Sequence, residues 1–171
     1  NNRYAYAYAV DFSMPASAQV FNCLKASGYR TVFLRVYDPR GKGQFDAVSV
    51  SNIRQAFSAR FGVEVYMTPQ IRSTKNGTTQ FAEIMYGLNS AGVKLNKVWI
   101  QVTSPVNWDP YPQNNVYFLN QIIAAAQFVN FSCLGGKSDF IELFLDMRES
   151  RIERFLKAFC VTIFFIGYLL T

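Results

Sequence analysis

Carboxylates are the main acid–base groups that this sequence offers, because its 171 residues include no histidine. Ser–His and Cys–His catalysis and histidine-ligated zinc are therefore excluded for this chain. The three cysteines, Cys23, Cys133 and Cys160, are odd in number and far apart, which fits neither a disulfide scaffold nor a metal-ligand spacing. Asp11, at the end of a predicted strand, and Glu64, within another, remain as candidate acids.

Polar side chains also occur at the end of a short apolar run within the stretch KVWIQVTSPVNW, residues 97–108. The run 98–102 is followed by a Ser-Pro break, a pattern typical of a buried strand whose carboxyl end opens onto a site. Gln101 and Thr103 lie at that end. Trp108 follows in the next loop, where it fits a stacking platform for a sugar ring and equally well a core residue.

Strands and helices are predicted to alternate through the first 130 residues. The opening segment alternates tyrosine with alanine, and three later runs are rich in β-branched and apolar residues. Four βα units in this order predict an α/β fold, a TIM-type βα barrel truncated to about four βα units, with a parallel sheet. The open edges of such a sheet would favour oligomers. The predicted strands are 3–10, 31–37, 63–67 and 98–102, and the predicted helices are 15–28, 49–60, 81–90 and 115–129.

Charged residues inside the predicted strands alternate with apolar neighbours. Arg35 is predicted to point toward the mouth of the barrel, and we expect it to pair with Asp11 or Glu64. Glu64 fits a position that lines the barrel, and it also fits an exposed or salt-bridged position. Asp38 and Asp46, which flank a glycine-containing loop, are interpreted as turn residues.

The chain changes character after residue 130, which suggests a division into a partial barrel, 1–130, and a divergent tail, 131–171. Residues 138–157 are charged and amphipathic, and the last 13 residues, Phe159 to Thr171, are almost wholly apolar. A membrane-spanning helix needs about 20 apolar residues. This helical, apolar tail therefore fits a buried or partner-packed helix, a short membrane anchor, or a segment that is not a selected part of the protein.

The charge balance narrows the class of partner. A formal net charge of +6 and a pI near 9.3 suit an anionic partner such as a bacterial wall, a membrane surface or nucleic acid. Nucleic acid is disfavoured because the sequence has no basic patch with interleaved aromatic residues. The chain opens on Asn1 rather than Met and has no leader, so a secreted chain whose leader was removed is expected, with a membrane-anchored chain as the alternative.

Four segments in order, YAVDFS, TVFLRVY, GQFDAVSVSNIRQAFSARFGVEVY and AGVKLNKVWIQVTSPVNW, resemble the lysozymes of glycoside hydrolase family 25. The resemblance covers residues 4–130 and is greatest to a divergent nematode and protist branch. It implies that Asp11 is catalytic at the barrel mouth, that Asp46 matches a family aspartate, and that Tyr66 is the family's strand tyrosine. The tail after residue 130 does not match, and the family's fifth to eighth strands, with a further active-site aspartate, are absent.

The family implies hydrolysis of the β-1,4 bond between the amino sugars of peptidoglycan, which requires a carboxylic acid and a second carboxylate. The family's Asp-x-Glu is here Gln101-x-Thr103, and loss of a general acid costs about 10² to 10⁴ in rate. We therefore expect a lysozyme-like protein of innate defence or digestion that acts on or recognises bacterial cell-wall polysaccharide with impaired hydrolysis. No metal or cofactor is implied. The alternative is a membrane-associated or partner-binding protein that works through its tail. The substrate-binding residues expected from the resemblance are Arg35, Glu64, Tyr66, Gln101, Thr103 and Trp108.

Overall fold

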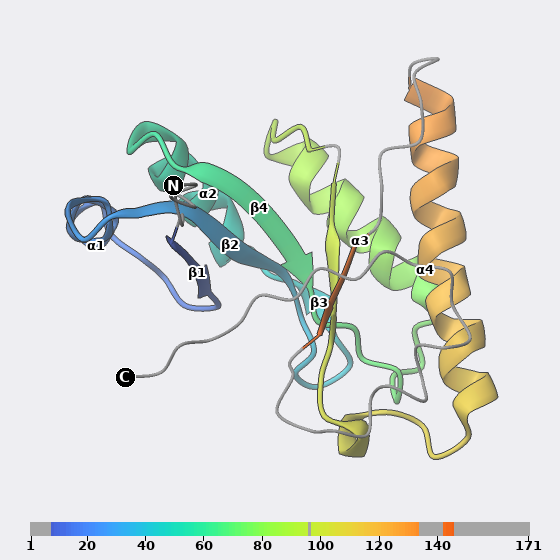
Figure 1. Ribbon diagram of the computed structural model, residues 1–171. Coiled ribbons are helices and arrows are strands. Elements are labelled where there is room, and N and C mark those ends of the chain that lie inside the picture. The colour runs from blue at the N-terminus through green and yellow to red at the C-terminus, as the bar shows by residue number, and fades with distance from the viewer. Residues whose placement is uncertain (1–7, 96, 134–141, 146–171) are drawn as a thin grey trace, which may run out of the picture.

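The computed structural model describes residues 8–95, 97–133 and 142–145, in which strands and helices alternate (Figure 1). The predicted apolar tail, Phe159 to Thr171, lies outside these residues, as does the start of the predicted first strand. The strands are β1 (Tyr8–Phe12), β2 (Tyr29–Asp38), β3 (Gln44–Phe45), β4 (Gly62–Met67), β5 (Trp99–Val102) and β6 (Glu142–Leu145). The helices are α1 (Ala18–Ala26), α2 (Val48–Ser58), α3 (Gly77–Ser90) and α4 (Pro112–Cys133), with one 3-10 turn, η1 (Pro105–Asn107).

The strands form one curled sheet in the order β1-β2-β4-β5-β6, a half-barrel with helices packed along its outer side (Figure 1). Each neighbouring pair in this order is parallel, and the short β3 pairs antiparallel with the end of β2. Parallel pairing confirms the prediction from the alternating strands and helices, since parallel strands need a crossover between them. The predicted strands that became β2, β4 and β5 were placed to within two residues.

The strand β6 lies within residues 138–157, the stretch that the sequence showed only as charged and amphipathic. Residues 142–145, with the sequence ELFL, pair in parallel with β5 over its full length, from Trp99 opposite Glu142 to Val102 opposite Leu145. The sheet therefore has a fifth parallel strand where the sequence predicted none. Such pairing satisfies the backbone groups along the edge of β5, which would otherwise be open.

Helix α3 begins earlier than predicted, at Gly77 rather than residue 81. The side chain of Asn76 accepts a hydrogen bond from the backbone N–H of Thr79 at 2.8 Å, which is the typical arrangement of an N-cap residue. Gly77 also allows close contact with α4, because a Cβ at this position would lie 2.5 Å from the carbonyl oxygen of Phe118. Capping and packing together thus extend the helix into a segment that the sequence predicted as loop.

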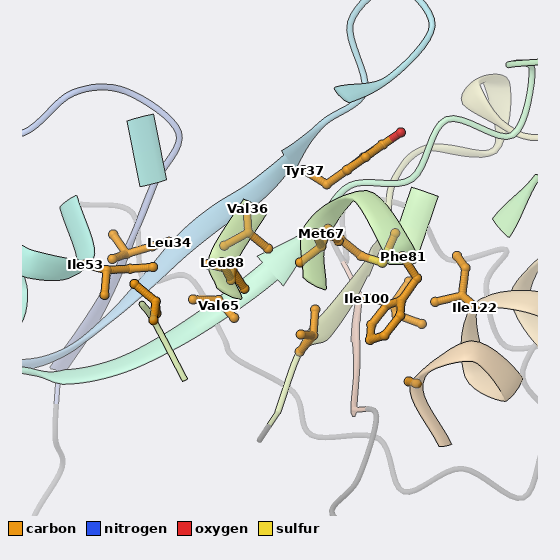
Figure 2. Close-up of a cluster of buried hydrophobic side chains, with 14 of the residues drawn as sticks. Leu34, Val36, Tyr37, Ile53, Val65, Met67, Phe81, Leu88, Ile100 and Ile122 are labelled. Atoms are coloured by element: carbon orange, nitrogen blue, oxygen red, sulfur yellow. The ribbon is translucent and has the colours of Figure 1, made fainter. Parts of the chain in front are cut away.

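The main hydrophobic core lies between the sheet and the helices. Side chains from β2, β4 and β5, among them Leu34, Val65 and Ile100, pack against side chains of α2, α3 and α4 (Figure 2). These strand residues are almost completely buried. Within the described part of the chain, no helix has the length and apolarity that crossing a membrane requires. The core fixes one face of the sheet, so the other face is available to carry a site.

Candidate functional site on the inner face of the half-barrel

The inner face of the sheet carries a second, aromatic cluster. Phe33, Tyr66 and Trp99, from β2, β4 and β5, pack together with Ala9 of β1 and are separate from the main core. The rings of Phe33 and Trp99 meet edge to face at a centroid distance of 5.6 Å. Because side chains alternate along a strand, the neighbours two positions away lie on this same face. They include most of the residues that the sequence predicted for the site.

Asp11 and Glu64 lie in one row across the inner face. The strand register places Asp11 opposite Phe33, and Phe33 opposite Glu64. Since neighbouring strands are about 4.8 Å apart, the two backbones are separated by roughly 10 Å. Glu64 Oε2 accepts a hydrogen bond from Trp99 Nε1 at 2.9 Å. The sequence left open whether Glu64 lines the barrel or is exposed or salt-bridged. This contact with Trp99 agrees with a position that lines the half-barrel.

Arg35 holds two acidic side chains at the end of β2. Its Nη2 atom lies 2.9 Å from Asp46 Oδ2 and 3.3 Å from Asp38 Oδ2, and its Nε donates to Asp46 at 3.1 Å. We expected Asp11 or Glu64 as the partner. The interpretation of Asp38 and Asp46 as turn residues was therefore incomplete, because both are buried and paired. No signal in the sequence shows that β3 returns along β2 and brings Asp46 to Arg35.

Asp38 is the more deeply buried of these two carboxylates, with 2% of its surface exposed. The guanidinium of Arg40 donates to Asp38 Oδ2 at 2.7 Å, and the backbone N–H of Arg40 donates to Oδ1. The hydrogen bonds from Arg40, aided by the charge of Arg35, hold the pKa of Asp38 below its ordinary value against the opposing effect of burial. Asp38 is therefore an ionised structural group at neutral pH and does not fit the role of a general acid.

Gln101 occupies the end of β5 on the inner face. Its side-chain oxygen accepts a hydrogen bond of 2.6 Å from the hydroxyl of Thr68, a buried residue just after β4. This contact fixes the orientation of the amide, whose NH₂ group carries two donors. Gln101 is therefore an oriented hydrogen-bonding group, and it cannot act as a general acid because its amide does not ionise at any ordinary pH.

Thr103 lies one residue beyond β5, where the chain turns into η1. Its hydroxyl oxygen accepts a hydrogen bond from Asn107 Nδ2 at 3.1 Å. A threonine hydroxyl can donate while it accepts, but it is far too weak an acid to protonate a leaving oxygen at neutral pH. The predicted pair Gln101 and Thr103 thus supplies hydrogen bonds and no carboxylic acid.

Trp108 does not offer its ring at the surface. It is 6% exposed and belongs to the main core, so of the two interpretations left open by the sequence, core packing holds and the stacking platform is wrong. Arg72 Nη2 donates to the carbonyl oxygens of Val106 and Trp108, which ties this loop to the loop after β4. The exposed aromatic side chain of this segment is Tyr111, at 61% exposure.

The described residues hold no group of three His, Cys, Asp or Glu side chains that could bind a metal ion. The inner face carries the carboxylates of Asp11 and Glu64 and the oriented side chain of Gln101, next to a buried cluster of aromatic rings. A few polar groups placed in this way can fix the orientation of a bound ligand.

The fold first defines the class of protein. The chain superposes on a family GH25 lysozyme from Aspergillus fumigatus with a TM-score of 0.58, at 13% identity, covering 81% of this chain and 64% of that one. At this identity the likeness shows the fold alone, which is that of a GH25 lysozyme. The family follows from the sequence match: the lysozyme-like protein 1 family matches residues 2–134, and the chain belongs to it.

Curated relatives agree with this family. Lysozyme-like proteins 1 and 2 of Caenorhabditis elegans are each 50% identical over 127 residues, which is 74% of this chain and 43% and 46% of theirs. The probable GH family 25 lysozyme 2 of Dictyostelium discoideum is 28% identical over 110 residues, 64% of this chain and 50% of that protein. The resemblance recognised in the sequence is confirmed, and the chain spans about half or less of the length of these relatives.

Proposed function

We propose that this chain recognises bacterial peptidoglycan at the inner face of its half-barrel, with impaired hydrolysis. The family and the GH25 fold support a polysaccharide ligand related to the lysozyme substrate. The observation that carries the proposal is the Thr68–Gln101 hydrogen bond, which holds a neutral amide where the family resemblance calls for an aspartate.

Glycoside hydrolysis needs one group that protonates the leaving oxygen and a second that attacks the sugar or activates water. Asp11 and Glu64 both lie on the inner face, and they flank Phe33 rather than lie at the end of β5. Trp99 Nε1 donates to one oxygen of Glu64, so this oxygen serves as a hydrogen-bond acceptor. Neither carboxylate occupies the position of Gln101 or Thr103, which supports impaired turnover.

Recognition without turnover requires no acid. The amide of Gln101 and the hydroxyl of Thr103 can exchange hydrogen bonds with sugar hydroxyls and acetamido groups. Tyr66 and Trp99, on the same face, are 5% and 7% exposed, so their rings serve as packing beside these groups. We therefore assign Gln101 and Thr103 to ligand orientation and Asp11 to a supporting polar role.

The half-barrel is, in this proposal, part of a TIM-type barrel, since the GH25 structure extends beyond the region that this chain matches. We also propose that the protein works outside the cell, in defence or digestion, because the polymer it would recognise is extracellular.

Sedimentation with insoluble purified peptidoglycan tests the proposal. We expect the native chain to bind and the variant Gln101→Leu to bind about tenfold more weakly, because one or two hydrogen bonds of about 1 kcal/mol each are lost. The matched control is Gln127→Leu, the same substitution at an exposed position on α4. Equal binding by both variants would refute the assignment of Gln101, and no binding by the native chain would refute the function.

A further inference from the structure

A concentration of basic residues lies at the end of the sheet opposite the candidate site. The connections that lead into β2, β4 and β5 all lie at the amino-terminal ends of these parallel strands. Residues 24–31, 54–62 and 89–98 contain no Asp or Glu. We define the basic face as five cations from these connections, namely Lys25, Arg30, Arg54, Arg60 and Lys94.

Several of these cations are held in place by backbone carbonyls at helix ends. Lys25 Nζ donates to the carbonyl oxygens of Ala59 and Arg60, just after α2, and Arg30 donates to that of Lys25 in the last turn of α1. In the same way, Arg54 Nη2 donates to a carbonyl oxygen just after α3. In these contacts the positive side chains interact favourably with the negative, carboxyl-terminal ends of the helix dipoles. They also join Lys25, Arg30 and Arg60 into one local group.

Helix ends offset only part of a full positive charge, about half an elementary charge each. Among the described residues, the ion pairs link Arg35, Arg40 and Lys75 to Asp38, Asp46 and Glu83, and none includes a residue of the basic face. Arg30, Arg54, Arg60 and Lys94 are exposed. The basic face therefore combines four solvent-exposed cations with the half-buried Lys25, and none of the five has an acidic partner in the described chain.

An exposed aromatic residue lies among these cations. Phe57 is 53% exposed near the end of α2, three residues after Arg54 and three before Arg60. Residues three apart on a helix are surface neighbours, so Phe57 lies close to Arg54. Arg60, just past the helix, has a positive φ of 59° that turns the chain toward β4. An exposed ring among cations is the combination found on proteins that bind the interface of anionic membranes.

We propose that the basic face docks on an anionic membrane surface through its cations, with Phe57 entering the headgroup region. This goes beyond the function proposed above, because the basic face and Gln101 lie at opposite ends of the strands. Docking would leave the mouth of the half-barrel turned away from the lipid. Each cation near such a surface contributes about a fivefold gain in partitioning, which weakens as salt screens the charges.

Sedimentation with phosphatidylglycerol vesicles, compared with phosphatidylcholine vesicles, tests the proposal on the full chain. We expect binding to the anionic vesicles alone, reduced about 25-fold by the double variant Arg60→Asn/Lys94→Gln. Asparagine is chosen at position 60 because it tolerates the left-handed conformation. The matched control is Lys42→Gln/Arg72→Gln, which removes two exposed positive charges at the other end of the sheet, neither of them in an ion pair among the described residues. Thermal unfolding checks that each variant is folded.

Equal losses in both double variants would overturn the proposal, because binding would then follow net charge alone. A second variant, Phe57→Ser, separates a membrane from a soluble polyanion. We expect it to weaken vesicle binding several-fold and to leave binding of long-chain inorganic polyphosphate unchanged. No effect on the vesicles would overturn the membrane assignment. Peptidoglycan binding by Arg60→Asn/Lys94→Gln should equal that of the native chain, so the two proposals fail or succeed separately.

Discussion

Replacement of Arg35 by methionine should destabilise the protein strongly, because it removes the cation that joins two buried carboxylates. Asp46 would lose two hydrogen bonds, of 2.9 and 3.1 Å, and Asp38 would keep Arg40 as its partner. Loss of one partner of a buried ion pair costs about 3–5 kcal/mol. Because the side chain of Arg35 is 15% exposed, we expect the lower end, about 3 kcal/mol.

Urea denaturation of four proteins tests this reasoning as a double-mutant cycle. Adding Asp46→Asn to Arg35→Met should recover about 2 kcal/mol, since the amide is neutral and its oxygen can still accept from the N–H of Val48. The matched control is Arg30→Met on the same strand, whose side chain donates to backbone carbonyls, and its loss should be about 0.5 kcal/mol. A loss below about 1 kcal/mol for Arg35→Met, or no recovery in the double variant, would refute the account of this network.

Three further predictions follow from single contacts. Thr68→Val should cost about 1 kcal/mol in unfolding free energy, because the half-buried side-chain oxygen of Gln101 loses its donor. Gly77→Ala should lower stability by about 1–3 kcal/mol, since its Cβ would lie 2.5 Å from a backbone oxygen of α4; an unchanged melting temperature would contradict the close packing. The depressed pKa of Asp38 means that the unfolded chain takes up this proton first as pH falls. Its stabilisation is thus complete above about pH 4 and is lost below it, and Arg40→Gln should flatten this part of a pH–stability curve.

Much of the fold could be predicted because most of its strands can be recognised from the pattern of residues within the strand itself. Apolar runs bounded by glycine or proline gave β4 and β5 almost to the residue, and the alternation with helices gave their parallel order. The strand β6 could not be predicted in this way. Its four residues, ELFL, are too short to show a period, and it is a strand because it pairs with β5, which is distant in the sequence.

The sequence was enough to predict which strand residues share the face of the candidate site. It was not enough to predict which side chains they contact. Strand periodicity is enough to place Asp11, Glu64 and Gln101 on one face, opposite the main core. The ion pair between Arg35 and Asp46 depends on the antiparallel return of β3, which no local pattern reveals. Trp108 was ambiguous for a similar reason, because only the folded loop decides whether a ring turns inward. Side chains whose neighbours come from distant segments are the ones that sequence reasoning misplaces.

The most direct test of the central claim is to measure binding and turnover of purified peptidoglycan on the same samples. Released reducing ends report turnover, and sedimentation reports binding, for the native chain and for Asp11→Asn. The account predicts binding by the native chain with no release of reducing ends above that of a sample without protein. Release by the native chain that disappears in Asp11→Asn would contradict it, because a complete acid pair would then operate despite Gln101 and Thr103.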